Sequence, residues 1–366
     1  MQSLLVTVDS LRYDAFCEHM PITREHLDWD HDATYSTGPN TGEAFPAIIG
    51  GEYPRKIGLL PESSVANEFD CYTAGISTNH LLSPKYGYDE GFDEFSSPGG
   101  DSGGIKDKAA RYFGQGSMMY RLGTKFWNVV EYMTPSSFQP SFKPASAVID
   151  DFERITEERD DWFVWLHFME PHHPYEPPTA EDRLEARQLS RSVIAGIDTD
   201  PETEEKVRSF YRQEVKGLDA ELERLWESLS EDTEVVFCAD HGELMGEGGE
   251  WGHIGTFQTD VLHVPIGGIN TEKPGDLASL VDVPSILLGK EHNKGNLSRE
   301  IAYATNGPEW AAIDGEDIAT PDGVFTLADG TETENPKLQR AQKSFDIKTS
   351  SLEEADTEDL EQLGYI

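Results

Sequence analysis

Four apolar runs along the chain predict buried strands. Residues 3–9 read SLLVTVD, and comparable runs lie at 71–77, 161–168 and 233–239. None of the four alternates apolar with polar residues. Such continuous runs are typical of strands that are covered on both faces, as in a parallel sheet.

Between these runs, apolar residues recur every three or four positions, which predicts helices. The clearest case is 202–230, and a shorter one is 146–158. Residues 260–268 predict one more strand, and 277–289 predict a short helix. Strands that alternate with helices are typical of an α/β fold. We therefore expect a largely parallel central sheet with helices on both faces.

The pattern changes along the chain and predicts two parts. Residues 1–290 carry the strands and helices and are expected to form the main domain, with a possible insertion at about 101–145, where no period is clear. From about 291 the chain is more polar. Residues 291–366 are expected to form a small C-terminal subdomain with an acidic tail, and 330–362 look weakly ordered or peripheral.

The charge balance narrows the range of partners. The chain has 69 acidic and 29 basic residues, a formal net charge of −40, and the acids are spread along its length. One interpretation is a protein that binds cations or basic partners. The other is adaptation to molar salt, where repulsion between surface charges is screened within a few ångströms. Dispersed acids favour salt adaptation, and they disfavour nucleic acid as a partner.

Composition also bears on the compartment. Aromatic residues make up 10% of the chain, which favours a packed core over disorder. No apolar run reaches 18 residues, so no membrane span is expected. The N-terminus MQSLLVTVDS lacks a basic start and a long apolar stretch, and the three cysteines form no close pair. These features predict a cytoplasmic protein, and they leave its oligomeric state open.

Polar clusters follow three of the predicted strands at the point where each strand ends. Asp9 follows the first, a histidine-rich segment HFMEPHHPY follows the third, and Asp240 with His241 follow the fourth. In α/β sheets the carboxyl ends of the strands form the binding site. We therefore expect these three segments to converge. Each cluster also has a purely structural interpretation. Asp9 would be a helix N-cap, the histidines would be core residues with their hydrogen bonds satisfied, and Asp240 would end a strand before a surface loop.

The residue types in these clusters point to metal chemistry. Asp240 and His241 offer a carboxylate oxygen and an imidazole nitrogen, a common pair for Zn²⁺ or Mn²⁺. A glycine-rich stretch follows, and His253 comes twelve residues after His241 on a loop that can fold back. The histidine-rich segment holds three His within seven residues, beside Glu170.

These motifs, in this order, resemble the sulfatases and their relatives in the alkaline phosphatase superfamily. The resemblance runs nearly end to end, from D-x-x-R-x-D at Asp9 through HFMEPHHPY and VVFCADHGELMGEGGEWGH to VLHVPI and the closing LEQLGYI. It implies an alkaline-phosphatase-like (sulfatase) α/β fold. It also implies an enzyme that acts on a sulfate or phosphate ester of a glycan or small molecule.

The chain departs from the sulfatase pattern at the nucleophile. Sulfatases carry C-x-P-x-R or S-x-P-x-R, whose first residue becomes formylglycine. The family spacing places Thr41 at that position, in NTGEAFPAIIGG, with neither the Pro nor the Arg, so no formylglycine is expected. Ser10 replaces a second Asp, His241 replaces an Asn, and Asn79 stands where many sulfatases have a Lys. Together the changes resemble the phosphoryl-transferring branch that uses a Thr nucleophile, such as lipoteichoic acid synthases.

The resemblance implies a role for each site residue. Asp9, Thr41, Asp240 and His241 would hold one divalent metal, which would be Mn, Zn or Ca. Thr41 would be the nucleophile, with His172 and His253 as further catalytic groups and His253 as the candidate proton donor. The expected substrate-binding residues are Arg12, His167 and His173, although Arg12 has a structural alternative in an ion pair with Asp14. A second metal is possible, with His253, Glu170 and His172 as imperfect ligands.

Two other functions stay open at this point. The chain is also compatible with a catalytically degenerate sulfatase-like binding protein that keeps the fold and one metal. It is compatible as well with a transferase that modifies surface glycans. Retention of the whole set of expected site residues argues against the degenerate protein, since a decaying site would be expected to lose some of them.

Overall fold

The structure of the protein is a computed structural model that describes residues 1–55, 58–60, 63–98, 142–197, 200–253 and 255–345. The expected insertion at about 101–145 falls almost wholly outside the described residues, and the expected acidic tail falls outside them from residue 346 onward.

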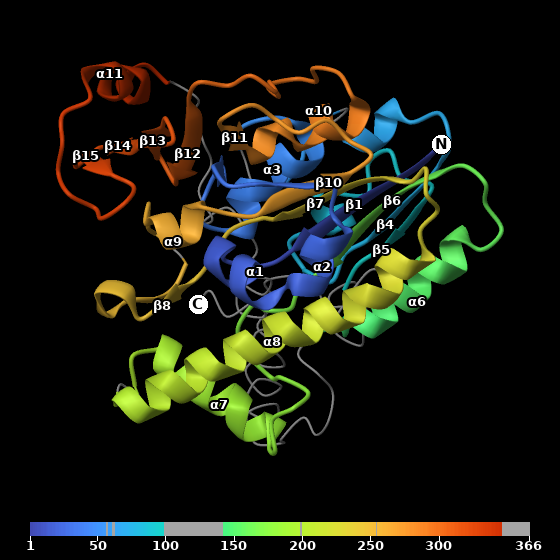
Figure 1. Cartoon of the computed structure of the whole chain (residues 1–366), viewed down its shortest axis with the longest axis horizontal. Coiled ribbons are helices and arrows are strands. Elements are labelled where there is room, and N and C mark those ends of the chain that lie inside the picture. The colour runs from blue at the N-terminus through green and yellow to red at the C-terminus, as the bar shows by residue number, and fades with distance from the viewer. Residues whose placement is uncertain (56–57, 61–62, 99–141, 198–199, 254, 346–366) are drawn as a thin grey trace, which may run out of the picture.

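A seven-stranded, mostly parallel sheet forms the centre of the molecule (Figure 1). Its strand order is β2-β10-β7-β1-β6-β4-β5, and only β10 runs antiparallel to its neighbours. The strands, in chain order, are β1 (Gln2–Val8), β2 (Trp29–His31), β4 (Tyr72–Ile76), β5 (Glu94–Ser96), β6 (Trp162–Phe168), β7 (Glu234–Ala239) and β10 (Ile266–Ile269). The four predicted core strands are thus β1, β4, β6 and β7.

The register of the three central strands aligns their carboxyl ends. Val8 at the end of β1 pairs with Phe168 on one side and with Ala239 on the other. Asp9 directly follows β1, and Asp240 directly follows β7. The two aspartates therefore leave the sheet at the same level, because neighbouring parallel strands in this register end together.

Helices cover both faces of the sheet, as predicted (Figure 1). On one face the long helix α8 contacts α1, α2, α6 and α7, and α6 contacts β6. On the other face α3 contacts α10, which contacts β7. The helices are α1 (Tyr13–His19), α2 (Pro21–His26), α3 (Thr41–Gly50), α6 (Ala145–Thr156), α7 (Arg183–Ile194), α8 (Pro201–Ser228), α9 (Thr259–Leu262) and α10 (Val283–Leu288). None of the helices in the described part of the chain combines the length and the apolar character needed to cross a bilayer.

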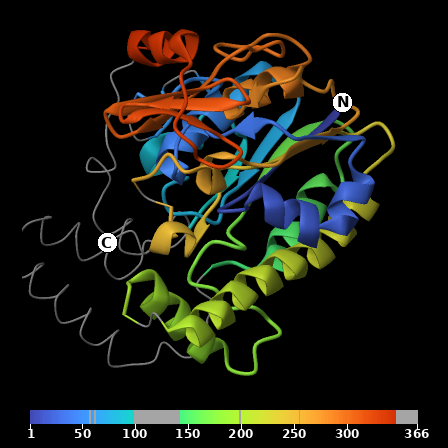
Figure 2. The same cartoon turned by 60° about the vertical axis from the view of Figure 1, so that its left-hand side comes forward.

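Residues after 291 form a second, antiparallel sheet of four strands. It has one small apolar core of its own and shares a second one with Tyr35, Leu262 and Leu277. Its elements are β12 (Ala302–Asn306), β13 (Glu309–Ile313), β14 (Asp317–Thr320), β15 (Gly323–Thr326) and the helix α11 (Pro336–Ser344). Both views place this sheet beside α3 and away from α8 (Figures 1 and 2). The helix α11 lies in a stretch expected to be weakly ordered. The domain boundary at about residue 290 stays a prediction.

The remaining elements are short. β3 pairs with β11, and β8 pairs with β9 in a small hairpin. Their bounds, with those of the 3-10 turns in the described residues, are β3 (Thr34–Tyr35), β8 (Leu244–Met245), β9 (Trp251–Gly252), β11 (Ala278–Ser279), η1 (Val65–Glu68), η2 (Pro84–Tyr86), η3 (Glu247–Gly249) and η4 (Leu280–Asp282).

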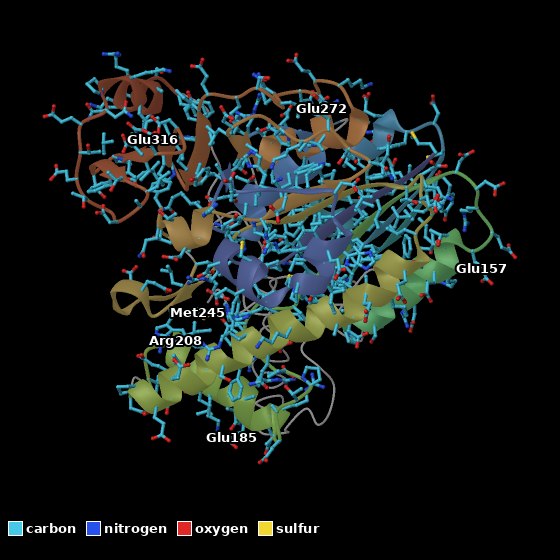
Figure 3. The ribbon with its side chains drawn as sticks, in the orientation of Figure 1. Glu157, Glu185, Arg208, Met245, Glu272 and Glu316 are labelled. Carbon is cyan, nitrogen blue, oxygen red and sulfur yellow. The ribbon has the colours of Figure 1, made fainter. Side chains whose placement is uncertain are left out.

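Acidic side chains lie on widely separated parts of the surface (Figure 3). Glu157, Glu185, Glu272 and Glu316 are all exposed and belong to different elements or loops. This dispersal agrees with the interpretation that the negative charge is a property of the whole surface. It does not by itself mark a binding site.

Candidate active site

Residues from five separate segments meet at the carboxyl edge of the central sheet. The segments follow β1, β4, β6 and β7, and the fifth is the start of α3. The side chains of Asp9, Thr41, Asn79, Asp240 and His241 are all fully buried there. The predicted convergence of strand ends is therefore present, and it also includes the segment after β4, which was not among the three segments expected to converge.

Two carboxylates face each other at the centre of the site, each fixed by its neighbours. One oxygen of Asp240 accepts the backbone N–H groups of Ser10 (3.1 Å) and His241 (2.8 Å). One oxygen of Asp9 accepts the hydroxyl of Ser10 (3.1 Å). Ser10 has a positive φ of 57°, which turns its N–H and its hydroxyl toward the two carboxylates. The residue that replaces the second Asp of sulfatases thus orients the two that remain.

Thr41 presents its hydroxyl to both carboxylates. Its Oγ1 lies 3.3 Å from Asp9 Oδ2 and 3.1 Å from Asp240 Oδ2. Thr41 is the first residue of α3, whose preceding residue Asn40 caps the helix by accepting the N–H of Glu43 at 3.2 Å. The hydroxyl therefore sits at the positive end of a ten-residue helix, where negative charge on an oxygen is stabilised.

Asn79 is a site residue to which the sequence analysis assigned no role. Its side-chain NH₂ donates to Asp9 Oδ2 at 2.9 Å and lies 3.5 Å from Thr41 Oγ1. Its carbonyl oxygen accepts the N–H of Leu81 at 2.9 Å. The signal that could have found Asn79 is its position two residues after the predicted strand at 71–77, at the same edge as the other polar clusters.

The electrostatics of this group call for a cation. Burial raises the pKa of Asp240, and the charge of Asp9 raises it further. Burial also acts to raise the pKa of Asp9, but the nearby imidazoles of His172, His167 and His241 outweigh it and hold that pKa well below its usual range. Two buried carboxylates side by side repel each other, and a divalent ion relieves that repulsion.

The orientation of His241 fits the same cation. Its Nδ1 lies 2.9 Å from the carbonyl oxygen of Gly242, so Nδ1 carries the proton in the neutral ring. Its Nε2 lies 3.5 Å from Asp240 Oδ2 and 3.7 Å from Asp9 Oδ1, and it has no hydrogen-bond partner among the described residues. A nitrogen that faces two carboxylate oxygens suits a positive charge between them, which is supplied either by a proton or by a metal ion. Burial acts to lower the pKa of His241, but the charges of Asp240 and Asp9 outweigh it and raise that pKa, which favours the proton. The donor set of Asp9, Asp240 and His241 therefore fits a divalent metal.

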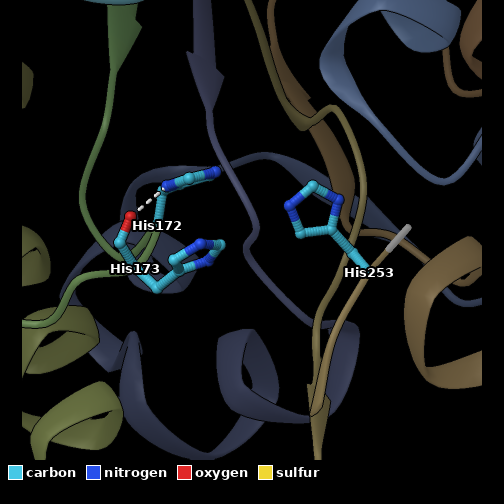
Figure 4. A group of neighbouring side chains, drawn as sticks. All are labelled: His172, His173 and His253. Atoms are coloured by element: carbon cyan, nitrogen blue, oxygen red, sulfur yellow. Dashed lines mark hydrogen bonds between the residues drawn. The ribbon is translucent and has the colours of Figure 1, made fainter. Parts of the chain in front are cut away.

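Three further histidines gather beside this group (Figure 4). One ring nitrogen from each of His172, His173 and His253 lies within 4.8 Å of the others, and all three rings are buried. His172 and His173 come from the segment after β6, and His253 lies opposite them (Figure 4). The His253 ring stacks on His241 with 4.2 Å between ring centroids. The two groups of side chains are therefore adjacent.

The glycine-rich motif brings His253 to the site. It forms the hairpin of β8 and β9, in which Leu244 pairs with Gly252. Gly246 and Gly252 have φ values of 101° and 86°, a region that side chains with a Cβ rarely occupy. Burial, and after it the charge of His241, hold the pKa of His253 well below its ordinary value. A protonated His253, the candidate proton donor, is therefore disfavoured near neutral pH.

His167 and Glu170 occupy different surroundings from those expected. His167 Nε2 lies 3.4 Å from Asp9 Oδ2, and its Nδ1 lies 3.0 Å from the hydroxyl of Thr7. The two nitrogens of its ring thus face Asp9 and Thr7. Glu170 accepts the N–H of Ala145 at 3.0 Å, at the start of α6, and it belongs to neither metal-type group among the described residues.

Arg12 is held by carboxylates that lie outside the site. Its guanidinium contacts Asp14 at 2.7 Å, Glu247 at 2.7 Å and Asp260 at 2.9 Å. Its side chain is 10% exposed. These contacts tie the start of α1 to the β8–β9 hairpin and to α9, and they favour the structural alternative for Arg12 over substrate binding.

Glu43 connects the candidate nucleophile to the C-terminal sheet. One of its oxygens accepts the N–H of Gly307 in the β12–β13 turn at 2.8 Å, and the other accepts the side-chain NH₂ of Asn40 at 2.7 Å. Burial raises the pKa of Glu43 to about 7. The C-terminal sheet therefore helps to fix the start of α3, next to Thr41.

Comparison with known proteins identifies relatives of this chain. Residues 4–266 match the Sulfatase family. The chain is 25% identical over 320 residues to a protein of Haloferax volcanii named low-salt glycan biosynthesis sulfotransferase Agl7; the match covers 84% of this chain and 64% of that protein. The chain thus spans less than two thirds of that relative's length.

Two solved structures share the fold. One is the phosphonate monoester hydrolase SpPMH of Silicibacter pomeroyi, with a TM-score of 0.60 and 15% identity, covering 93% of this chain and 92% of that one. The other is the lipoteichoic acid synthase LtaP of Listeria monocytogenes, with a TM-score of 0.62 and 15% identity, covering 100% of this chain and 90% of that one. At this identity the two structures support the fold alone, which is the predicted alkaline-phosphatase-like fold. Since the matched region takes up well over half of the chain, this protein belongs to the sulfatase family.

Proposed function

We propose that this protein is a metal-dependent enzyme that acts on a sulfate or phosphate ester, with Thr41 as its nucleophile. The observation that carries the proposal is the position of the Thr41 hydroxyl, 3.3 and 3.1 Å from the two carboxylates that also fit a divalent metal. A threonine hydroxyl donates a single hydrogen bond, so packing alone does not explain why it faces two buried carboxylates. It is placed where its proton can be removed.

The residues of the chain divide the work as follows. Asp9, Asp240 and His241 would hold a divalent metal, which when bound would supply the Lewis acidity that lowers the pKa of the Thr41 hydroxyl. Asn79 donates to Asp9 and holds that carboxylate in place, and the N-terminus of α3 stabilises negative charge on Thr41 Oγ1. The Thr41 hydroxyl passes its proton to one of the two carboxylates beside it, and its oxygen attacks the phosphorus or sulfur in line. The bond from that atom to the leaving oxygen breaks, and the leaving group departs on the opposite side with the bonding electron pair. His172 and His253 line the adjacent space, where the non-bridging oxygens of the ester would lie.

The same geometry supports chemistry without formylglycine. By the family spacing Thr41 stands at the position of the modified residue, and Gly42 and Glu43 follow it in α3 in place of the usual motif. We infer a covalent ester of Thr41 as the intermediate, which water or an acceptor alcohol resolves. Hydrolysis and transfer thus share the first step and differ in the second.

A transferase is the second candidate, and one comparison favours it. The Haloferax relative is named as a sulfotransferase of glycan biosynthesis. If this chain transfers its group to a glycan hydroxyl, added acceptor alcohol should shift the product from inorganic anion to a new ester without changing the rate of the first step.

The test is turnover of p-nitrophenyl esters in molar KCl with Mn²⁺ or Zn²⁺, comparing a phosphodiester with the sulfate. Thr41→Ala should lower the rate by a factor on the order of 10³ or more while the fold is kept. Thr41→Ser, which retains a hydroxyl, is the matched control and should keep part of the activity. Full activity of Thr41→Ala would contradict the proposal. A loaded, folded protein that turns over no ester would support the binding-protein alternative.

A further inference from the structure

We propose that Glu43 is a positioning residue for the reaction, which holds Thr41 and His253 in place through the loop of residues 36–40. Through the same side chain, the C-terminal sheet takes part in building the site. The inference rests on the proposed function, because it concerns the geometry in which Thr41 reacts. Glu43 acts through other residues and is not itself expected to touch the ester.

The side chain of Glu43 bridges two segments that are far apart in the chain. Its Oε1 accepts the N–H of Gly307, in the β12–β13 turn, at 2.8 Å. Its Oε2 accepts the side-chain NH₂ of Asn40 at 2.7 Å. The carboxylate therefore connects the C-terminal sheet, which lies beside α3 (Figures 1 and 2), to the residue directly before Thr41.

This bridge also fixes the direction of the Asn40 side chain. With its NH₂ group bound to Glu43, Asn40 turns its side-chain oxygen toward the backbone N–H of Glu43, which it accepts at 3.2 Å. That contact is the N-cap of α3. Each of the two side chains thus orients the other. Because Thr41 is the first residue of the helix, a cap that turned would displace the Thr41 hydroxyl from the two carboxylates.

The loop of residues 36–40 is packed directly against Glu43. The backbone carbonyl of Glu43 accepts the hydroxyl of Thr37 at 2.9 Å, and the carbonyl of Thr37 accepts the N–H of Thr305 at 2.8 Å. A Cβ atom at Gly38 would lie 2.3 Å from Glu43 Cβ, so only glycine allows this close approach. The loop is therefore held between α3 and β12.

One carbonyl of this loop orients His253. Pro39 stands between Gly38 and Asn40, and its carbonyl oxygen accepts the Nδ1–H of His253 at 2.8 Å. Since the residues on both sides of Pro39 are held against Glu43, this carbonyl has little freedom to turn. A change at Glu43 would therefore reach the nucleophile and His253 together.

The burial of this carboxylate calls for more than a packing role. Glu43 is 5% exposed, and Asn40 is 2% exposed. Taking a carboxylate out of water is costly, and an apolar side chain would fill the same space without that cost. The geometry uses both acceptor oxygens, one for the Gly307 N–H and one for the Asn40 NH₂. Glutamine offers one oxygen and one NH₂ group in their place.

The test reverses the hydrogen bond between the two side chains. In Glu43→Gln, Asn40 either faces a second NH₂ group or turns its amide and loses the cap. The variant should lower kcat for the preferred p-nitrophenyl ester by about 10- to 100-fold, since a displacement of about 1 Å has effects of that size. The double variant Asn40→Asp/Glu43→Gln restores a matched donor and acceptor in reversed order, with the same net charge. It should return kcat to within about threefold of the wild type.

Metal content and melting temperature separate this role from a general loss of structure. Glu43→Gln should keep the metal content of the wild type, and its loss should appear in kcat more than in KM. Asp219→Asn is the matched control, because Asp219 is also a buried carboxylate and accepts the N–H groups of Ile22 and Thr23 at 3.0 and 2.8 Å. It lies on α8, away from α3, and its variant should lose stability and keep kcat.

A folded Glu43→Gln with kcat within about twofold of the wild type would overturn the inference, and so would a double variant that stays as slow as Glu43→Gln. Asn40→Ser keeps a capping oxygen and removes only the NH₂ group that Glu43 accepts. It should also lower kcat, and an unchanged kcat would overturn the inference even if Glu43→Gln does not fold. The proposed function fails separately, if Thr41→Ala remains active.

Discussion

Asn79 offers a sharp test of how the candidate site is built, because it touches both a metal-type ligand and the nucleophile. Asn79→Ala removes the NH₂ that donates to Asp9 at 2.9 Å. A hydrogen bond to a charged group contributes about 1.5–3 kcal/mol. If the orientation of Asp9 matters mainly in the transition state, kcat/KM should fall by about 10- to 160-fold. The loss should appear in kcat more than in KM, since Asn79 has no reason to contact the bound ester.

The matched control is Asn335→Ala. Asn335 also accepts a backbone N–H, that of Leu338, and also donates to carboxylates, those of Asp314 and Asp317. It lies at the start of α11. Both variants should lose a similar amount of stability, and only Asn79→Ala should lose activity. The assay is steady-state turnover of the preferred p-nitrophenyl ester at saturating metal, with metal content and melting temperature measured in parallel. If Asn79→Ala stays within about twofold of the wild type in kcat/KM, the hydrogen bond does not set the geometry of Asp9, and the reasoning is refuted.

Three further predictions concern the molecule around the site. Arg12→Gln should lower the free energy of unfolding by about 1–3 kcal/mol in a denaturant titration and leave KM and metal content unchanged, since its partners are carboxylates outside the site; a raised KM at unchanged stability would instead make Arg12 a substrate ligand. Burial, and then the charge of Glu170, raise the pKa of Glu214 from 4.5 to about 8. The folded protein therefore favours the protonated side chain. The stability that this preference contributes is full below pH 4.5 and is lost as pH rises toward 8. Glu214→Gln should therefore match the wild type in melting temperature near pH 4.5 and exceed it above pH 8, by about 2–4 °C per kcal/mol, and equal melting temperatures at both pH values would contradict this. The melting temperature of the wild type should rise between about 0.2 and about 2 M KCl, because salt screens the repulsion expected from a net charge of −40, and a flat or falling curve would argue against salt adaptation.

The sequence by itself determined the framework of the protein. Continuous apolar runs predicted β1, β4, β6 and β7, and the period of apolar residues predicted α8, because both signals arise locally from which faces of an element are buried. The positions of Asp9, Asp240 and His241 at strand ends followed from the same pattern, because a parallel sheet brings its carboxyl ends to one edge.

Only the tertiary structure decided which of these residues form the site and which have structural roles. In the sequence, Ser10 stands where sulfatases have a second Asp. In the structure it has a positive φ and hydrogen-bonds to both Asp9 and Asp240. Arg12 belongs to a family motif, and its three carboxylate partners come from segments far away in the chain or from its own turn. Such pairings depend on side-chain directions after packing.

The histidines show the same limit most clearly. Their spacing marked a ligand-rich segment, but it could not tell which of His167, His172 and His173 point to the same place as His253. The backbone turn after β6 and the β8–β9 hairpin set those directions, and Glu243 selects His173 by a hydrogen bond across 70 residues. Local pattern fixes where strands and helices lie in the sequence, whereas long-range contacts fix which polar atoms meet.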